Sequence, residues 1–176
     1  MTGLKEAKMT FDELYENFFL RIYNYARYHC SNEQEAEDLT SCIFEKLYKR
    51  FNTYSSDKAS LEVWVFVVAR SVTVDFFRWK KFRSLLPFTT VQEETLTAPH
   101  DNPAENLEQD STEKQLQEIL RILSRQEREI LNLHYYQHLK QAEIATIMNL
   151  TQSNVGVILH RAVKKIKMKF GNVYEE

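Results

Sequence analysis

Hydrophobic residues recur every three or four positions along most of the chain, which is the spacing of one buried helix face. Four such segments begin with Ser or Thr followed three residues later by Glu or Gln, a pattern in which the two side chains cap the first turn of a helix. These starts are Thr10, Ser31, Thr112 and Ser124. We therefore predict helices that begin at these four residues, the first two running to about Cys30 and Phe51.

Residues 60–82 have a pattern that fits two structures. The start, LEVWVFVV, has the β-branched and aromatic content of a strand. The segment then continues without Gly or Pro into VARSVTVDFFRWKKF, which is too long for an ordinary strand. This length favours a buried helix.

The C-terminal part contains two short apolar-periodic segments, residues 144–150 and 155–166, with Asn149 near their junction. Asn tolerates the left-handed backbone that a tight turn needs. Thr151 follows, and its hydroxyl is placed to cap the second helix. We predict a helix-turn-helix here, ended by Gly171 as a left-handed cap.

The second helix of this pair is strongly cationic, with no carboxylate between Thr151 and Phe170. A solvated helix end would suit the negative pole of the helix dipole equally well. Beside a helix-turn-helix, the cations favour a surface that faces DNA phosphates. The cations are Arg161, Lys164, Lys165, Lys167 and Lys169.

Composition divides the chain into three parts. Only three glycines and three prolines occur in 176 residues, which favours helices over hairpins and barrels. Residues 84–111 hold all three prolines and six carboxylates without a Lys or Arg, the composition of a linker. The predicted fold is all-α, with an N-terminal helical bundle (1–83) and a C-terminal four-helix domain containing the helix-turn-helix (112–176), joined by an acidic flexible linker. Two such domains should move separately until a partner fixes them.

The sequence offers no catalytic, cofactor-binding or metal site. His134 and His138 have zinc-ligand spacing on a helix, but Tyr135 stands where the protease pattern needs Glu, so packing is favoured. Cys30 and Cys42 fit a reducing compartment and ordinary packing. Neither a signal peptide nor a membrane span is evident, so we expect a soluble, cytoplasmic protein without membrane insertion.

The second half of the 60–82 segment interleaves rings with cations from Arg70 to Arg83. An aromatic stripe at helical spacing is usually core. Trp79 differs, because it lies inside the cationic run and could be buried only together with charged neighbours. Cations for phosphates beside rings for unstacked bases are what single-strand binding requires.

Two blocks of the chain, taken together, resemble the extracytoplasmic-function type of bacterial sigma factor, the small two-domain promoter-recognition subunit of RNA polymerase. AEDLTSCIFEKLYKRF (36–51) followed by VWVFVVARSVTVDFFRWKK (63–81) resembles the family's second region. LSRQEREILNLHYYQHLKQAEIATIMNLTQSNVGVILHRAVKKI (123–166) resembles its fourth. The second block alone resembles many response regulators, but both blocks in this order are specific.

The resemblance implies three surfaces and an additional partner. The helix over 36–51 would dock on core RNA polymerase through Asp38, Glu45 and Lys49. The loop 52–59 and the helix after it would melt and hold the minus-ten element as single strand, through Trp64, Arg70, Ser71, Arg78, Trp79, Lys80 and Lys81. The last helix would bind the minus-thirty-five duplex through Gln152, Ser153, Asn154, His160, Arg161, Lys164 and Lys165. An anti-sigma factor would regulate the protein.

The chain departs from the family at several of these positions. Gly156, Val157 and Ile158 stand where the family commonly has Lys, Ser and Arg, and none of their side chains can hydrogen-bond to DNA. The family usually has Asn at Ser71 and a second Arg at Trp79. We therefore expect unusual preferences at both promoter elements.

One competing hypothesis is a stand-alone helix-turn-helix transcriptional regulator whose N-terminal helices bind a ligand or dimerise. It predicts tight duplex binding without polymerase, whereas a sigma factor should bind DNA weakly alone and act only with core polymerase. A small helical enzyme would need acid, base or metal groups that the sequence lacks.

Overall fold

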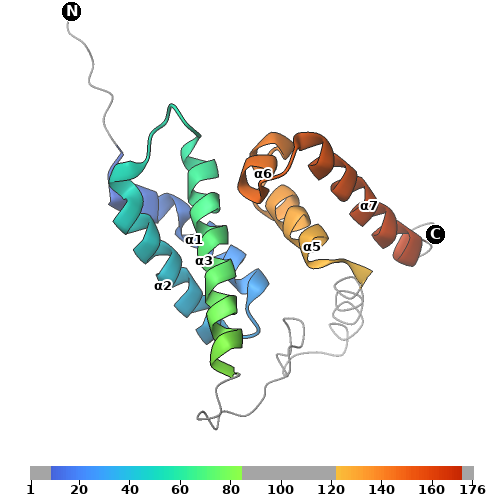
Figure 1. The fold of residues 1–176 in the computed structure, drawn as a ribbon, viewed down its shortest axis with the longest axis horizontal. Coiled ribbons are helices and arrows are strands. Elements are labelled where there is room, and N and C mark those ends of the chain that lie inside the picture. Colours follow the sequence, from blue (N-terminus) through green and yellow to red (C-terminus); the bar gives the residue numbers. More distant parts are fainter. Residues whose placement is uncertain (1–8, 85–121, 172–176) are drawn as a thin grey trace, which may run out of the picture.

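The computed structural model of the protein describes residues 9–84 and 122–171, and within them every regular element is helical (Figure 1). The N-terminal module, residues 9–84, contains α1 (Phe11–His29), α2 (Glu33–Arg50), the short η1 (Phe51–Thr53) and α3 (Leu61–Ser84). The C-terminal module, residues 122–171, contains α5 (Arg125–Leu131), the single π-turn η2 (Asn132–Tyr136), α6 (Gln141–Met148) and α7 (Gln152–Phe170). The all-α prediction is confirmed; nearly all of the linker and of the helix predicted from Thr112 lies outside the described residues.

Side-chain caps fix where the first two helices begin. At α1 the Thr10 hydroxyl accepts from the Glu13 amide (3.3 Å), and the Glu13 carboxylate accepts from the Thr10 amide (2.7 Å), as predicted. The prediction of Ser31 as the cap of α2 is wrong by one residue. Asn32 is the cap, and its side chain accepts from the Glu35 amide (2.8 Å).

The segment with two possible structures, 60–82, is helical. It forms most of α3, which packs against α2 on one side and α6 on another. Buried side chains therefore occur round much of the helix, including Val63, Val65, Phe66 and Val68. The β-branched residues that resembled a strand are explained by this burial on two sides.

The helix-turn-helix is formed by α6 and α7. Asn149 between them has φ 55° and ψ 50°, the predicted left-handed conformation, and the Thr151 hydroxyl accepts from the Asn154 amide (3.2 Å). Gly171 was predicted to be left-handed, but its φ of −64° is right-handed, so that prediction is wrong. His138 has φ 57° and follows the end of η2, so it does not share a helix face with His134.

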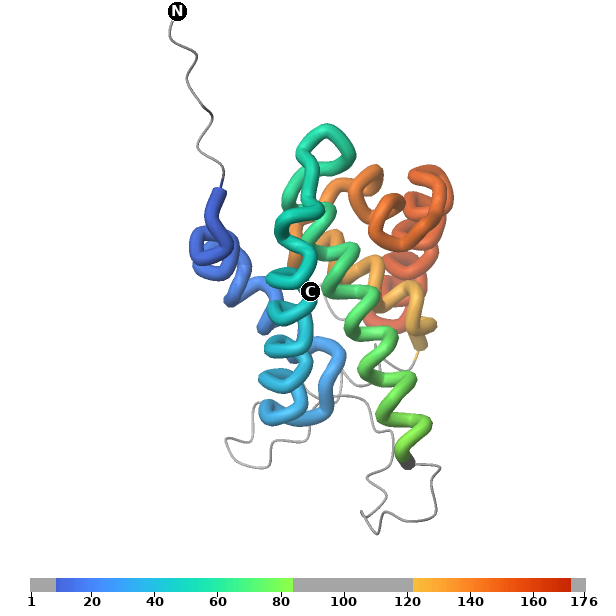
Figure 2. The backbone as a smooth tube through the Cα atoms, turned by 60° about the vertical axis from the view of Figure 1, so that its left-hand side comes forward, coloured from blue at the N-terminus to red at the C-terminus, as the bar shows by residue number. Residues whose placement is uncertain are grey.

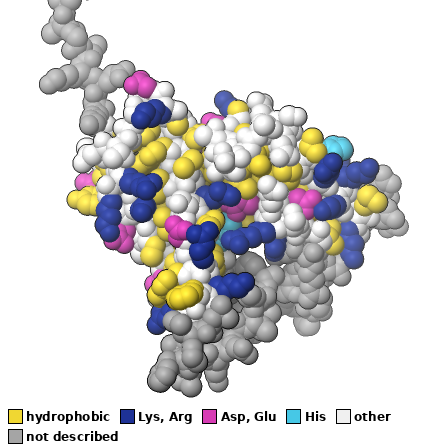
Figure 3. Space-filling view, viewed as in Figure 1, with side chains coloured by type: hydrophobic (Ala, Val, Ile, Leu, Met, Phe, Trp, Pro, Cys, Tyr) yellow, Lys and Arg dark blue, Asp and Glu magenta, His cyan; other side chains and the backbone are white. Residues whose placement is uncertain are grey.

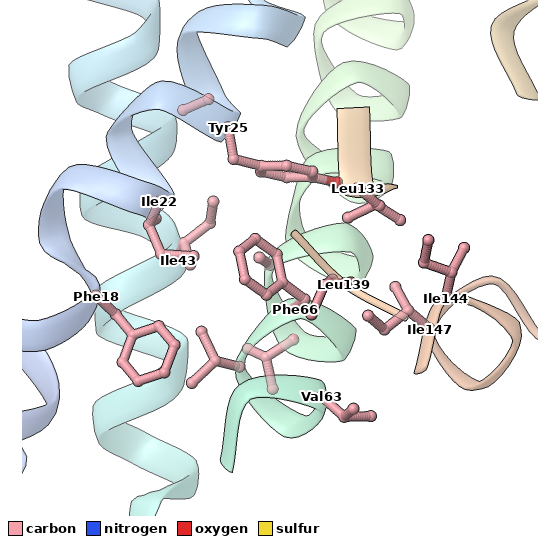
Figure 4. Close-up of a cluster of buried hydrophobic side chains, with 14 of the residues drawn as sticks. Phe18, Ile22, Tyr25, Ile43, Val63, Phe66, Leu133, Leu139, Ile144 and Ile147 are labelled. Carbon is pink, nitrogen blue, oxygen red and sulfur yellow. The ribbon is translucent and has the colours of Figure 1, made fainter. Parts of the chain in front are cut away.

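The two modules pack against each other. In both views the C-terminal module lies against α3 (Figures 1 and 2). One continuous buried cluster contains Phe66 of α3, Ile22 and Ile43 of the N-terminal module, and Leu133 and Leu139 of the C-terminal module (Figure 4). The acidic linker suggested domains that move separately, whereas the structure packs the two modules together through α3 and α6. The sequence alone cannot distinguish burial of the α3 face against α6 from ordinary core packing.

Candidate nucleic-acid interface

The C-terminal end of α3 is an exposed mixture of rings and cations. Trp79 is 59% exposed, and the guanidinium of Arg83 lies 4.9 Å from the centre of its ring, within the range of a cation–π contact. Phe82, Arg78 and Lys81 are also exposed. Lys and Arg side chains gather over this half of α3 and along α7 (Figure 3). A flat exposed ring held beside cations can stack on an unpaired base.

Two cations of this surface also bind carboxylates. Lys80 lies 2.5 Å from Glu35, whose side chain is buried at the start of α2, so Lys80 ties α3 to α2. Arg78 lies 3.4 Å from Asp75, one turn away on the same helix, and both side chains are well exposed. An exposed pair of this kind is weak and can exchange for a phosphate, whereas Lys80 is held more firmly.

A groove of about 490 Å³ separates α2 from α3. Glu45 and Lys49 line it from α2, and Ser71 and Trp79 line it from α3. The Glu45 carboxylate is paired with Lys49, whose ammonium lowers the pKa of that carboxyl. Asp38 is exposed on α2 but does not line the groove. Two of the residues predicted to contact polymerase and two of those predicted to contact DNA therefore line one groove.

Two residues expected at the minus-ten surface lie away from it. Trp64, near the start of α3, is partly buried against the core, and its ring lies 5.4 Å from that of Tyr54. It packs against the start of the loop that precedes α3. Arg70 lines a cavity of about 340 Å³ between the two modules, together with Arg125 of α5. The α3 residues are thus divided among the exposed helix end, the loop contact and the inter-module cavity.

The predicted reading surface of α7 is open. Its N-terminal residues and the cations one or two turns later are exposed: Gln152, Ser153, Asn154, His160, Arg161 and Lys164. Lys165 is also exposed in part, but its ammonium donates to both carboxylate oxygens of Glu127 in α5 (2.7 and 2.9 Å). Although burial opposes its ionisation, the hydrogen bonds from Lys165 and Ser124 hold the pKa of Glu127 below its ordinary value. Lys165 therefore has a structural partner that the sequence did not reveal.

A set of polar contacts joins α1 to α5, here called the α1–α5 contact: Tyr25, Tyr28 and His29 with Arg128 and Glu129. The Tyr25 hydroxyl donates to Glu129 (2.7 Å), the Tyr28 hydroxyl donates to the Arg128 carbonyl (3.0 Å), and His29 Nε2 lies 3.0 Å from the Glu129 carboxylate, off the ideal hydrogen-bond line. Glu129 is only 7% exposed.

The chemistry of this contact explains how a carboxylate is buried between modules. Burial opposes the charge of Glu129, but His29 and Tyr25 outweigh it, so the pKa of Glu129 is lowered. Burial, with Glu129 beside it, raises the pKa of Tyr25 well above its ordinary value. Arg21 adds a further link by donating to the Gln137 carbonyl (2.6 Å). No sequence signal pairs residues about a hundred positions apart, so the sequence alone does not predict these contacts.

The fold and surfaces define a class: a helical DNA-binding protein with a C-terminal helix-turn-helix and an exposed aromatic and cationic helix end. The chain matches the families described as Sigma-70 region 2, over residues 14–83, and Sigma-70, region 4, over residues 113–166. It belongs to the sigma-70 family of RNA polymerase sigma factors, and to their extracytoplasmic-function (ECF) type. The family resemblance is confirmed.

Relatives and solved structures agree with this assignment. The chain is 28% identical over 160 residues to the ECF RNA polymerase sigma factor BldN of Streptomyces coelicolor, covering 89% of this chain but only 58% of BldN. It is 26% identical over 160 residues to the ECF RNA polymerase sigma factor SigM of Bacillus subtilis, covering 90% of this chain and 94% of SigM.

Two solved structures share the fold. CnrH in complex with the cytosolic domain of CnrY matches with a TM-score of 0.66 and 15% identity, over 92% of this chain and 88% of that one. The sigma factor RpoE in complex with the anti-sigma factor NepR, from Bartonella quintana, matches with a TM-score of 0.68 and 19% identity, over 90% and 94%. None of the helices within residues 9–84 and 122–171 combines the length and the hydrophobicity of a membrane-spanning segment.

Proposed function

We propose that this protein binds core RNA polymerase and directs it to a set of promoters, contributing DNA recognition and strand opening while the polymerase carries out the chemistry. The observation that supports this most is the presence of both sigma-70 regions, in family order, on one chain. The exposed surfaces on α3 and α7 are the two types of surface that such a protein needs: rings with cations for single strand, and a cationic helix for duplex.

We assign roles by module. Residues 1–83 would bind polymerase through Asp38, Glu45 and Lys49 and hold the opened minus-ten strand through the α3 residues named above. Residues 84–111 would connect the modules, and residues 112–176 would bind the minus-thirty-five duplex through α7. The shared groove between α2 and α3 supports placing the polymerase contact next to the opened strand. We propose that the protein acts in the cytoplasm and has no catalytic activity of its own.

Reading both promoter elements requires the modules to separate. The two elements are centred about 25 base pairs apart, which corresponds to about 85 Å of B-form duplex. Modules joined through Tyr25 and Glu129 cannot reach both positions. Residues 85–121 can span about 120 Å when extended, which is enough to bridge that distance. The packed arrangement is therefore a resting form that opens when polymerase and promoter are engaged.

An anti-sigma factor would stabilise this resting form. One matched structure is a sigma factor bound to an anti-sigma factor, and it covers 90% of this chain, both modules included. A partner that contacts both modules would oppose their separation, and its release would permit initiation. This arrangement gives a physical reason why one bound protein could block two distant DNA-binding surfaces.

The direct test is transcription in vitro with core polymerase that lacks any other sigma factor, on a genomic set of run-off templates. The proposal predicts discrete transcripts that require both the core and this protein. Tight, sequence-specific duplex binding by the protein alone, with no transcript from any template, would instead support the stand-alone regulator. A matched variant, Trp79→Ala, should reduce transcripts while leaving duplex binding by the holoenzyme largely intact.

A further inference from the structure

The three positions at which α7 departs from its family point in different directions. Gly156 faces α6, because a Cβ added there would lie 3.1 Å from Gln141 Oε1. Ile158 is half-buried and packs against the core. Val157 alone projects outward, and it is 44% exposed. Only one of the three departures therefore changes the surface that would face DNA.

Val157 lies at the centre of that surface. It is two residues from the buried Val155 and from the buried Leu159, so it points to the opposite side of the helix from the core. Ser153 precedes it by one turn and Arg161 follows it by one turn, and both are exposed. An apolar side chain is thus surrounded by polar ones on the face predicted to read base pairs.

The chemistry of the major groove limits what this side chain can recognise. Most atoms on the groove edge of a base pair are hydrogen-bond donors or acceptors, and the C5 methyl group of thymine is the apolar exception. Placing Val157 against a donor or acceptor would remove water from that group without replacing its hydrogen bond, which is unfavourable. Against a methyl group, the same contact buries apolar surface and is favourable.

We infer that Val157 reads a thymine in the minus-thirty-five duplex through its C5 methyl group. This inference rests on the proposed function, and it adds a specificity residue to the polar set. Gln152, Ser153 and Asn154, in the first turn of α7, would read neighbouring base edges, and Arg161 and Lys164 would hold the phosphates. At the groove, an apolar contact from Val157 then stands where the family commonly has Ser.

Deoxyuridine provides the test, because it differs from thymidine only by the missing methyl group. The minus-thirty-five sequence is first selected with holoenzyme formed from core polymerase and the full chain. Each thymine of the selected duplex is then replaced singly by deoxyuridine, and holoenzyme binding is measured. We expect one position at which the replacement weakens binding about fourfold, the ratio for losing one buried methyl-sized group.

Variants of the protein test whether the preference for thymine over uracil arises from the Val157 side chain. Val157→Ala should abolish the preference for thymine over uracil at that position, and Val157→Thr, which retains a methyl group, should keep most of it. Lys164→Ala should weaken binding to all duplexes and leave the ratio unchanged. Because Val157 and Lys164 are both exposed, all three variants should fold, which circular dichroism can check.

Two outcomes would overturn the inference while leaving the proposed function intact: a selected duplex in which no thymine responds to deoxyuridine, or a Val157→Ala variant that keeps the full ratio. Failure of the holoenzyme to bind or transcribe any promoter would instead overturn the proposed function itself. The two failures are therefore distinguishable.

Discussion

The helices α3 and α7 carry similar mixtures of cations but differ in how much of the protein covers them. The helix α3 is packed on two sides, and the residues predicted to bind DNA are divided among a loop contact, the inter-module cavity and one exposed end. The helix α7 presents its reading residues on one open face, and the structure ties Lys165 to α5. The packed arrangement thus leaves the proposed duplex-reading residues of α7 accessible, apart from Lys165, but keeps Arg70 of the proposed strand-holding set between the modules.

The largest effect should come from weakening the α1–α5 contact, which holds the two modules together. Tyr25→Phe removes the hydroxyl that donates to the buried Glu129. Loss of a hydrogen bond to a charged group costs about 1.5 to 3 kcal/mol, and the cost falls on the packed arrangement of the modules. Energy transfer between dyes on the two modules should report a shift toward the open form.

Tyr23→Phe is the matched control for that experiment. Tyr23 is on the same helix, but its hydroxyl donates to Glu33 within the N-terminal module (3.1 Å). The Tyr23→Phe variant should therefore leave the distance between the modules unchanged. Equal effects of the two variants would contradict the role assigned to the α1–α5 contact.

The next effect concerns the open face of α7. For holoenzyme binding to a minus-thirty-five duplex, combining Arg161→Ala with Lys164→Ala should reduce the slope of the log binding constant against log salt concentration by about two. The double variant should also weaken binding about 30-fold near 0.15 M salt. Adding Lys165→Ala should change the slope little further, because Lys165 is already paired with Glu127. An unchanged slope in the double variant would refute the assignment of this face to phosphates.

Acid should weaken the packed arrangement through Glu129. Its pKa is lower in the folded chain than the ordinary value of 4.5, so its ionised form stabilises the fold above that value. The stabilisation is lost as the pH falls through the lowered pKa, so thermal stability should be insensitive to this group near neutral pH and fall in acid. Glu129→Gln should be less stable at neutral pH and should lose part of the acid dependence. If the thermal stability of Glu129→Gln fell in acid as steeply as that of the unchanged protein, Glu129 would not be the source of the acid dependence.

The smallest effect should come from Gly156. Ala is a better helix former than Gly by about 1 kcal/mol, and the added Cβ would meet only the flexible end of Gln141. Gly156→Ala should therefore raise the free energy of unfolding by somewhat less than that amount, with no change in holoenzyme binding to DNA. Gln141→Ala in the same background should recover the full gain. A loss of DNA affinity in Gly156→Ala would show that residue 156 lies on the face of α7 that contacts DNA, contrary to this account.

Local signals in the sequence predicted the parts of the structure that local physics determines. The capping pair of Thr10 and Glu13 and the left-handed Asn149 are examples, because each depends on residues within a few positions. The left-handed conformation predicted for Gly171 is wrong, because the chain there continues with right-handed helical dihedral angles. The phase of α7 could have shown that Val157 faces outward, since Val155 and Leu159 fix the buried side.

Long-range features could not be predicted. Tyr25 and Glu129 are 104 residues apart, and each is an ordinary position on an amphipathic helix until the modules meet. The same applies to Arg70, which the family resemblance assigned to DNA and the structure places in a cavity against α5. The composition of a helix indicates what it can bind, and only the packing shows which of its side chains are accessible.

The central claim is that the modules rest together and separate when both promoter elements are read. One measurement tests it directly: energy transfer between dyes at Asn24→Cys on α1 and Met168→Cys on α7, in a Cys42→Ser background. Both sites are exposed, and Cys30 is buried with its pKa raised to about 12, so it should not be labelled. We predict efficient transfer in the protein alone and very little in a transcribing complex with core polymerase and promoter. Efficient transfer in both states would contradict the account.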